Sequence, residues 1–462
     1  MPELTPKLDL NNEMPLYIQL YEYIKSEIKK GKLQPNMKLP SKRKLSRYLG
    51  ISQNTIENAY SQLIAEGYIE ALSRKGYFVC NIEQELIFQE KQLNKDIPEK
   101  LFYDPTYHFD FSHTGVDSGA FPYAVFRKLT NEVIRPENEQ ILRIGHPQGE
   151  FKLRETIAKY LFHSRGVYCS PSQIVIGAGS HYLYRLLFQL LAGSRFAVED
   201  PGYQRRFVIF EKGEENVEMI PLDKEGIMVS HLEKTTANAV FVTPSHHFPC
   251  GLVMPISRRM QLLKWAEERE DRFIIEDDYD SEFRYSGKPI PALQGMDRDG
   301  KVIYMGTFSK ALIPSLRISY LVLPMLLIKK YQEEFFIYSQ TVSRIDQEIL
   351  AKFIVEGYWE KHINKMRVVY HRKRNELVAA ISSFFPNSAE IIGQDSGLHV
   401  LVRVHNGMNE QELVAEALKY NIKVYPVSAY GKSDNKTILL GFGIMPEEEI
   451  SQGIQLLSKA WL

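Results

Sequence analysis

A lysine in the last third of the chain has the neighbours required by a cofactor that carries both an aldehyde and a phosphate. Lys310 lies in the run Gly306-Thr307-Phe308-Ser309-Lys310, and Arg317 follows shortly after it. The lysine amine can form a Schiff base with an aldehyde, while hydroxyl and guanidinium groups hold a phosphate. Pyridoxal 5'-phosphate has both groups, so the sequence predicts an aldimine at Lys310.

The other groups of this cofactor find candidate partners at the ends of predicted strands. Asp277 can keep the ring nitrogen protonated, and Tyr279 can hydrogen-bond the phenolic oxygen, because both side chains share one face of an extended chain. The run Gly-Ala-Gly-Ser at 177–180 follows a strand and opens a helix, which makes an anion site. Tyr203 can stack on the ring. The residues expected to hold the phosphate are Gly179, Ser180, Thr307, Ser309 and Arg317.

The first eighty residues have the pattern of a small helical module followed by a hairpin. Apolar residues recur at helical spacing over 15–30, Ser41 can cap a helix over 42–49, and a third helix begins near Ser52. Alternating residues over 68–80 predict a hairpin. Two helices joined by a tight glycine-centred turn and followed by a hairpin form a winged helix-turn-helix, which is a DNA-binding motif.

The last helix of that motif begins with side chains that can read or clamp DNA. Gln53 and Asn54 can pair with adenine, and Thr55 can reach a phosphate or a thymine methyl group. Arg43 in the preceding helix and Arg74 in the hairpin can contact the backbone. The first eighty residues hold 12 lysines and arginines against 8 acidic residues, which suits DNA, although a solvated helical surface explains that charge equally well.

From residue 108 onward, strand-like and helical stretches alternate. The strand-like runs are 174–176, 196–198, 239–243, 273–276, 302–305 and 318–323. The helical stretches between them lie near 151–163, 181–191, 202–211, 257–268 and 325–335. This alternation indicates a largely parallel α/β sheet, and a long helical stretch over 340–383 then leads to a smaller α/β lobe. The predicted domains are a DNA-binding domain (1–81), a charged linker (82–107) and a cofactor-binding body (108–462).

The composition restricts the class of protein. The 462 residues carry no net charge, and the three cysteines are widely spaced without a metal-ligand pattern. The N-terminal Met1-Pro2-Glu3-Leu4 is not a signal peptide, and no apolar run approaches the length needed to cross a bilayer. We therefore expect a soluble cytoplasmic protein with no metal site and no membrane partner.

The N-terminal module resembles the GntR-type winged-helix family over residues 14–80. Five motifs follow the family's order: Pro15-Leu16-Tyr17-x-Gln19-Leu20, Leu39-Pro40-Ser41-x-Arg43, Leu49-Gly50-Ile51-Ser52, Ala59-Tyr60-x-x-Leu63 and Glu66-Gly67. The resemblance implies that a double-stranded DNA operator is contacted by Ser41, Arg43, Gln53, Asn54, Thr55 and the hairpin around Arg74. Gln53 stands where arginine is frequent in the family, which changes the group that can read a base there.

The rest of the chain resembles the fold-type I aminotransferases over residues 108–462, with a large parallel-sheet lobe and a smaller C-terminal lobe. The landmarks, in the family's order, are His146-Pro147-Gln148-Gly149, Gly177–Ser180, Pro249-Cys250-Gly251, Asp277 with Tyr279, and Lys310 with Arg317. A GntR-type head joined to such a body is similar to the MocR group of transcription regulators. That resemblance implies a head-to-tail homodimer, in which the winged helix of one chain lies against the body of the other.

Within the MocR group the chain is most similar to the GabR-type members, which regulate γ-aminobutyrate use. An effector carboxylate is best held by arginine in a bidentate fork, and Arg205 matches one such effector-binding position. The second arginine of that type should fall within 424–430, where this chain has Ala429, and its last arginine is Arg403. We therefore expect neither γ-aminobutyrate as the effector nor efficient transamination of ordinary amino acids.

Three hypotheses about function follow. In the favoured one, the protein is a regulator in which an amine or amino-acid effector displaces Lys310 from the cofactor and shifts the lobes. In the second, it is an active aminotransferase that carries a DNA-binding domain. In the third, pyridoxal 5'-phosphate is itself the signal. The first and third hypotheses make the chain a regulator rather than an enzyme, with at most weak residual transaminase activity.

Overall fold

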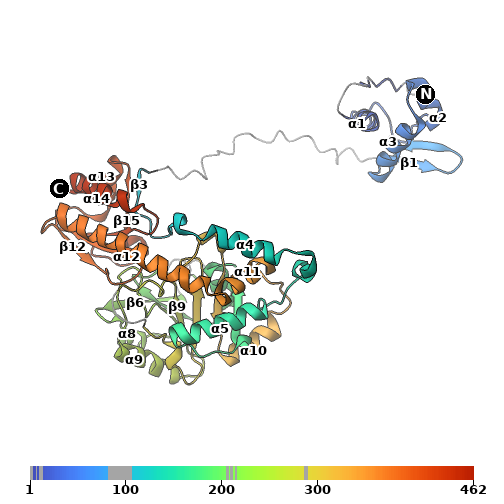
Figure 1. The fold of residues 1–462 in the computed structure, drawn as a ribbon. Helices are drawn as coiled ribbons and strands as arrows, with labels where there is room; N and C mark the ends of the chain where they lie inside the picture. Colours follow the sequence, from blue (N-terminus) through green and yellow to red (C-terminus); the bar gives the residue numbers. More distant parts are fainter. Residues whose placement is uncertain are drawn as a thin grey trace. The chain divides into compact units, whose positions relative to one another are not determined.

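The computed structural model describes residues 4–6, 8–9, 14–81, 107–203, 208, 212–213, 216–285 and 290–462. The chain forms two compact units, residues 1–105 and 106–462, each with its own hydrophobic core. Figure 1 shows the course of the chain within each unit. The predicted linker over 82–107 falls almost wholly outside the described residues.

Residues 14–81 of the first unit form three helices and a two-stranded hairpin. The elements are α1 (Leu16–Lys29), α2 (Lys42–Leu49), α3 (Gln53–Ala65), β1 (Ile69–Leu72) and β2 (Gly76–Val79). Apolar side chains from the three helices, among them Leu20 and Ile56, share one core. Ser41 Oγ accepts a hydrogen bond from the Lys44 backbone N–H at 3.3 Å, and Gly50 ends α2 in the left-handed region. Both predicted boundaries of α2 are therefore confirmed.

In the described part of the second unit, a large lobe is built on an eight-stranded sheet. Its strand order is β4 (Ile174–Gly177), β11 (Ser319–Val322), β10 (Val302–Thr307), β9 (Phe273–Asp278), β8 (Ala239–Val242), β5 (Phe196–Asp200), β6 (Val217–Asp223) and β7 (Gly226–Ile227). The five strands from β10 to β6 run parallel, whereas β11 and β7 are antiparallel to their neighbours. The expected α/β fold is confirmed, but the sheet is mixed. The connection from β10 to β11 covers only residues 308–318 and contains the turn η8 (Pro314–Leu316) but no α-helix, whereas a parallel crossover needs a longer connection.

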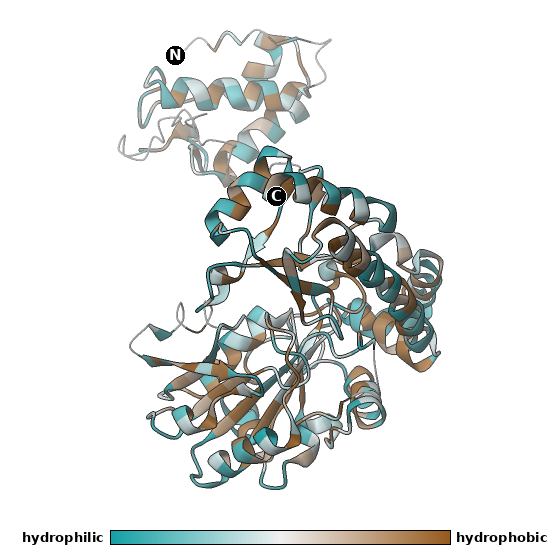
Figure 2. Cartoon of the chain, turned by 90° about the vertical axis from the view of Figure 1, so that its left-hand side faces the viewer, coloured by the Kyte–Doolittle hydropathy of each residue, from teal (hydrophilic) through white to brown (hydrophobic). Residues whose placement is uncertain are grey.

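Helices cover both faces of this sheet, so its strands form a predominantly hydrophobic layer (Figure 2). α6 (Ser180–Leu190) and α10 (Met325–Glu334) pack on one face, and α5 (Phe151–Arg165) and α9 (Ile256–Glu267) pack on the other. Successive residues of one strand face opposite ways, so Val240 packs under α9 and Phe241 under α6. α4 (Tyr123–Val133) and α11 (Arg344–Val355) pack against each other, and α11 also contacts α5.

The smaller lobe is built on a sheet of order β12 (Ala389–Ile392), β13 (His399–Val404), β16 (Thr437–Gly441) and β15 (Tyr425–Pro426). α14 (Glu447–Trp461) packs between α12 (Tyr358–Phe384) and α13 (Glu410–Lys419). Figure 1 shows the long α12 extending from this lobe toward α11 of the large lobe. β3 (Phe109–Asp110) pairs with β14 (Ile422–Lys423), so the beginning of the second unit joins its C-terminal lobe.

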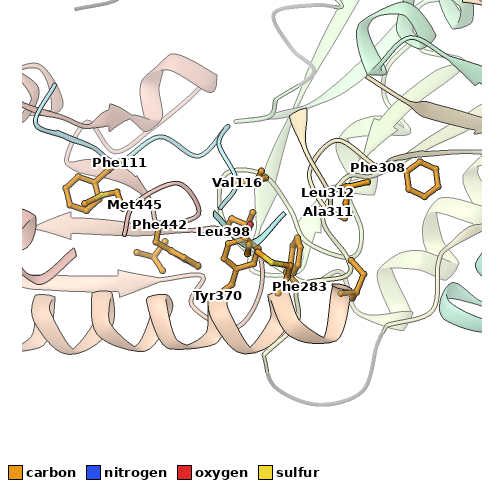
Figure 3. Close-up of a cluster of buried hydrophobic side chains, with 14 of the residues drawn as sticks. Phe111, Val116, Phe283, Phe308, Ala311, Leu312, Tyr370, Leu398, Phe442 and Met445 are labelled. Carbon is orange, nitrogen blue, oxygen red and sulfur yellow. The ribbon is translucent and has the colours of Figure 1, made fainter. Parts of the chain in front are cut away.

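One hydrophobic core connects the two lobes of the second unit. It includes Phe442 and Met445 from the smaller lobe, and Ala311 and Leu312 from the loop of the large lobe that carries Lys310 (Figure 3). Close packing of this kind transmits displacements, because side chains have little free volume in which to move. The Lys310 loop is therefore held by packing from both lobes.

Two parts of the helix pattern differ from what the sequence predicts. The helical stretch over 340–383 is two helices, α11 and α12, because Gly357 takes a φ of 77° between them, a left-handed conformation that ends α11. The helix predicted over 202–211 lies largely outside the described residues. Within the ranges that the structure describes, no helix is long and apolar enough to span a membrane.

Candidate cofactor site and DNA-binding surface

Most of the residues predicted to bind the cofactor line one cavity of the second unit, with a volume of about 260 Å³. The predicted residues that line it are Ser180, Tyr203, Asp277, Tyr279, Thr307, Ser309, Lys310 and Arg317. They come from the ends of β9 and β10, the start of α6, and the loops that follow β5 and η8. Residues far apart in sequence thus meet at the carboxyl edge of the parallel strands, where open α/β sheets bind their ligands.

Lys310 lies in the loop after β10, and its side chain reaches the cavity. Its Nζ donates a hydrogen bond to the backbone carbonyl of His113. Burial lowers the pKa of Lys310 to about 8, with the Asp280 carboxylate acting weakly in the opposite direction. A larger fraction of this amine is neutral near pH 7 than in an ordinary lysine, and the neutral amine is the form that attacks an aldehyde.

One end of the cavity is a candidate anion site, because it has groups that attract negative charge. Gly179 precedes α6 at a φ of 87°, and a Cβ added there would overlap the Arg317 guanidinium, so the glycine lets that arginine lie against the start of the helix. Both the unpaired N–H groups of a helix start and a guanidinium attract a phosphate. Ser309 Oγ is buried and has no hydrogen-bond partner among the described residues, which suits a group that binds a ligand.

Asp277 lines another wall of the same cavity. It is the last residue but one of β9, and its Oδ2 accepts a hydrogen bond from the Tyr184 hydroxyl at 2.6 Å. Tyr184 belongs to α6, so the helix that opens the anion site also holds this carboxylate. A hydrogen bond to the ionised form stabilises it, as a partner of a protonated ring nitrogen requires.

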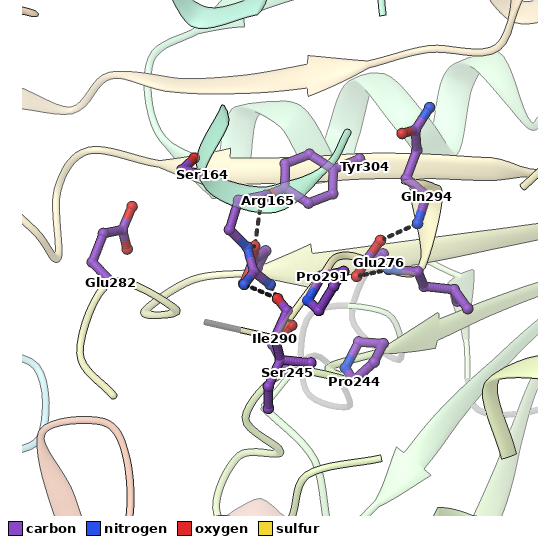
Figure 4. A network of polar contacts seen from close by, with 12 residues as sticks. Ser164, Arg165, Pro244, Ser245, Glu276, Glu282, Ile290, Pro291, Gln294 and Tyr304 are labelled. Carbon is purple, nitrogen blue, oxygen red and sulfur yellow. Dashed lines mark hydrogen bonds and ion pairs between the residues drawn. The ribbon is translucent and has the colours of Figure 1, made fainter. Parts of the chain in front are cut away.

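A buried polar network on the other side of β9 fixes the strand end that carries Asp277 (Figure 4). Glu276 accepts two backbone hydrogen bonds, both at 2.8 Å. Asp278 Oδ2 accepts hydrogen bonds from Arg165 Nε at 2.7 Å and from the Tyr304 hydroxyl at 2.5 Å. Because side chains alternate along a strand, holding Glu276 and Asp278 on one side directs Asp277 to the cavity.

The aromatic walls of the cavity contain residues that the sequence pattern does not single out. These are His113, Tyr184, Phe248 and His399. The ring of Tyr203 meets that of Phe248 edge-on, with centroids 5.6 Å apart. Phe248 lies beside the Pro249-Cys250-Gly251 landmark, which could have identified it. His113 and His399 gave no such signal, because a lone histidine has no spacing pattern.

Of the two positions considered for binding an effector carboxylate, the structure describes only one. Arg205 lies outside the described residues. Ala429 belongs to η9 (Val427–Tyr430), which contacts the loop after β5 through a 2.9 Å hydrogen bond from the Gly202 N–H to the Tyr430 carbonyl. The Tyr430 hydroxyl lies 3.3 Å from His113 Nε2. The η9 segment therefore approaches the cavity wall through an aromatic side chain, and Ala429 adds no charge there.

In the first unit, the residues predicted to face DNA lie on and just before α2, at the start of α3 and in the hairpin turn. The exposed ones are Ser41, Arg43, Gln53, Asn54 and Arg74. Thr55 is half-buried, and its backbone N–H is bound by Ser52 Oγ at 3.1 Å, which caps α3. A 2.7 Å ion pair between Lys42 and Glu57 joins α2 to α3. The start of α3 is thus held rigidly and left open to solvent, as a recognition helix requires.

Models of two known families match the chain. Residues 16–79 match the bacterial regulatory proteins of the gntR family, and residues 113–455 match aminotransferase class I and II. The first match covers the three helices and the hairpin, and the second covers the cofactor cavity. The amine, the carboxylate and the anion site of that cavity fit pyridoxal 5'-phosphate, the cofactor of this aminotransferase fold.

Individual relatives agree with these matches. The chain is 44% identical over 462 residues to the uncharacterized HTH-type transcriptional regulator YdeL of Bacillus subtilis, and the alignment covers 99% of both chains. It is 29% identical to the probable rhizopine catabolism regulatory protein MocR of Rhizobium meliloti, over 98% of this chain and 95% of the relative. A crystal structure of Pyrococcus horikoshii kynurenine aminotransferase in complex with PMP is 27% identical, with a TM-score of 0.68 over 77% of this chain and 91% of that chain.

The predicted combination of a GntR-type head, an aminotransferase-like body and pyridoxal 5'-phosphate is confirmed by these matches, while the closer likeness to GabR-type members stays a prediction. YdeL and MocR, which match nearly the whole length of the chain, bear the names of regulators. The chain belongs to the MocR-type HTH transcription regulators, in which a DNA-binding head is joined to an aminotransferase-like body.

Proposed function

We propose that this regulator holds pyridoxal 5'-phosphate on Lys310 and uses the cavity as a sensor, either of an amine or amino-acid effector or of the cofactor itself. The observation that carries the proposal is the convergence in one cavity of a lysine with a lowered pKa, the Asp277 carboxylate and the anion site beside Arg317. When bound, the cofactor supplies an aldehyde that reacts reversibly with amines and a ring that withdraws electrons.

Each part of the cofactor has a proposed partner in this chain. Lys310 provides the amine, Asp277 pairs with the ring nitrogen, Tyr279 hydrogen-bonds the phenolic oxygen, and Tyr203 lies against the ring. The phosphate is held by Gly179, Ser180, Thr307, Ser309 and Arg317. Arg205 is the proposed partner of an effector carboxylate.

A change at Lys310 has a physical route to the rest of the body. Ala311 and Leu312, which follow it directly, belong to the core shared by both lobes. An effector amine that displaces the lysine moves this loop and so favours a different arrangement of the lobes. We propose that the DNA-binding heads respond to that rearrangement at a double-stranded operator, which they contact through Ser41, Arg43, Gln53, Asn54, Thr55 and Arg74.

We further propose that the protein acts in the cytoplasm as a head-to-tail homodimer, the arrangement that the MocR resemblance implies. Apolar side chains more than half exposed on the second unit support a partner surface: Leu142, Ile144, Ile337 and Tyr338. The rings of His146 and Phe336 lie 5.2 Å apart and bring the two segments together. Light scattering should give twice the chain mass for the wild type and a smaller mass for Ile337→Asp; a monomeric wild type would contradict the proposal.

The experiment that tests the cofactor assignment is reductive trapping. Borohydride treatment of the loaded protein, followed by peptide mass spectrometry, should find the added mass on the peptide that contains Lys310 and on no other. Lys310→Ala should show no added mass, and Lys301→Ala, which changes a lysine outside the cavity, should behave as wild type. Trapping at another lysine would overturn the assignment.

A second candidate function is that of an aminotransferase with a DNA-binding appendage, and it is favoured by the completeness of the cavity. Lys310, Asp277 and Arg317 all line the cavity, so the groups that we propose for holding the cofactor are all present. We propose that the protein is a regulator with at most weak transaminase activity. Ketoacid formation from a panel of amino acids should therefore be far slower than for dedicated aminotransferases, and rapid turnover with any of them would favour the enzyme.

A further inference from the structure

Behind the cavity wall, Tyr279 forms a buried polar group with two side chains that the proposed cofactor contacts do not include, His246 and Asp280. His246 Nδ1 lies 3.0 and 2.9 Å from the two carboxylate oxygens of Asp280. The same nitrogen lies 3.0 Å from the hydroxyl of Tyr279, whose ring stacks on the imidazole. His246 and Asp280 are almost wholly buried, with 2% and 3% of their side chains exposed.

The proton of this group can be placed by elimination. Beside a carboxylate, Nδ1 has to carry the hydrogen, because two acceptors facing each other would repel. His246 Nε2 is buried and finds no hydrogen-bond partner in the described ranges, so Nδ1 makes the hydrogen bonds of this ring. The imidazole therefore carries a hydrogen on Nδ1 and donates it to Asp280.

The hydrogen on His246 Nδ1 determines whether the Tyr279 hydroxyl can donate a hydrogen bond to the histidine. Among the described residues, His246 is the hydrogen-bond partner of the Tyr279 hydroxyl, and a protonated Nδ1 cannot accept from it. Burial, followed by the Asp280 charge, raises the pKa of Tyr279 well above its ordinary value, so the phenol keeps its proton. The remaining acceptor for that proton is on the cavity side, where Tyr279 lines the wall beside Lys310.

The smaller lobe closes this group off from water. Gly397, at a φ of 75°, packs so tightly on it that an added Cβ would overlap His246 Cε1 and lie 2.8 Å from Asp280 Oδ2. The Gly397 carbonyl accepts a 2.6 Å hydrogen bond from the Tyr285 hydroxyl, and its N–H donates to the Phe283 carbonyl at 2.8 Å. Gly397 therefore leaves no room for a water molecule on that side of the His246–Asp280 pair.

We propose that His246, whose Nδ1 hydrogen is held by Asp280, is a positioning residue. Because His246 cannot accept from Tyr279, the Tyr279 hydroxyl donates its hydrogen bond to the phenolic oxygen of the cofactor. This inference rests on the proposed cofactor site. A donor aimed at that oxygen stabilises its ionised form and so sets the pH at which the bound cofactor changes between its two absorbing forms.

Other titratable groups face the same site and must be held constant in any test. Asp277, Asp278 and Glu199 act electrostatically on Tyr279. The ring of His399 is tilted by 41° against that of His246, with centroids 5.5 Å apart, and burial lowers the pKa of His399 to about 3, so it stays neutral. His247 is likewise neutral, since burial lowers its pKa to about 3. Lys310 lies in the same cavity wall.

The test is a pH titration of the absorption spectrum of the full-length, cofactor-loaded protein. In His246→Leu, Asp280 loses its donor and competes for the Tyr279 proton, so the midpoint should rise by about one pH unit. In His246→Asn, the amide nitrogen can still donate to Asp280, so the midpoint should stay within about 0.3 units of wild type.

His246→Phe provides a second variant that keeps an aromatic ring at this position, in case leucine disturbs folding. Phenylalanine has no donor for Asp280 and leaves the charge of Asp280 in place, so the midpoint should again rise by about one unit. His247→Asn removes a neighbouring buried histidine that does not contact Tyr279, and its midpoint should stay near that of wild type.

The outcomes separate this proposal from the one on which it rests. An upward shift in His246→Leu and His246→Phe, with His246→Asn near wild type, supports it. Unchanged midpoints in both His246→Leu and His246→Phe, with cofactor still bound, overturn it and leave the proposed cofactor site intact. A wild-type protein that binds no cofactor overturns both.

Discussion

The DNA-binding surface and the cofactor cavity are built in different ways. On the first unit, the side chains proposed to contact DNA are mostly exposed and lie on two helices adjacent in sequence and in the hairpin turn, with local caps such as Ser41 and Ser52. In the second unit, the side chains proposed to bind the cofactor converge from several strands and are fixed by buried contacts such as Arg165 with Asp278. A change in the first unit should therefore act locally on DNA affinity, whereas one in the second should act on stability and cofactor geometry together.

The largest effect is expected from breaking the buried network behind β9. Arg165→Met leaves Asp278 as an uncompensated buried charge, which should lower the free energy of unfolding by about 3–5 kcal/mol. All three tryptophans, Trp265, Trp359 and Trp461, lie in the second unit, so denaturant unfolding followed by tryptophan fluorescence reports on that unit selectively. Arg143→Ala, at an exposed ion pair, is the control and should change little.

The next effect concerns the recognition helix. Asn54→Ala should weaken binding to the cognate operator by about 1–3 kcal/mol, because a bidentate contact to a base edge is lost. The absorption spectrum of bound cofactor should not change. Gln62→Ala is the matched control, since Gln62 lies on the same helix but bonds Glu66 instead. Equal losses of DNA affinity in both variants would show that Asn54 does not read a base.

The lowered pKa of Lys310 predicts how cofactor uptake depends on pH. Because the neutral amine reacts, the uptake rate of the apo protein should rise about tenfold per pH unit below about pH 8 and level off above it. Stopped-flow absorbance with added pyridoxal 5'-phosphate measures this rate. A rate that keeps rising toward pH 10 would mean that burial does not lower the pKa of Lys310.

The smallest effect is expected from the cap of α2. Ser41→Ala removes the side-chain acceptor for the Lys44 N–H and should cost the first unit about 1 kcal/mol. Hydrogen exchange of the α2 amides in the full chain should accelerate, while exchange in β9 should not. Ser61→Ala, in the exposed middle of α3, should leave α2 exchange unchanged.

The same contrast explains how much of the molecule the sequence could predict. The bounds of α2 and the start of α3 follow from local signals, Ser41, Gly50 and Ser52, and the structure reproduces them. Lys310, Asp277 and Arg317 could be proposed because each has a recognisable neighbour at a strand end. The antiparallel course of β11, and the roles of Tyr184 and His246, could not be predicted, because they depend on which distant elements pack together.

The central claim is that the state of the cofactor site changes the affinity of the protein for its DNA operator. The measurement that tests it most directly is the operator affinity of the wild type and of Lys310→Ala, each with and without pyridoxal 5'-phosphate and an amine panel, at fixed salt concentration. Wild-type affinity should change at least several-fold with the cofactor or with one amine, and Lys310→Ala should not respond. Identical wild-type affinity under all conditions would contradict the claim.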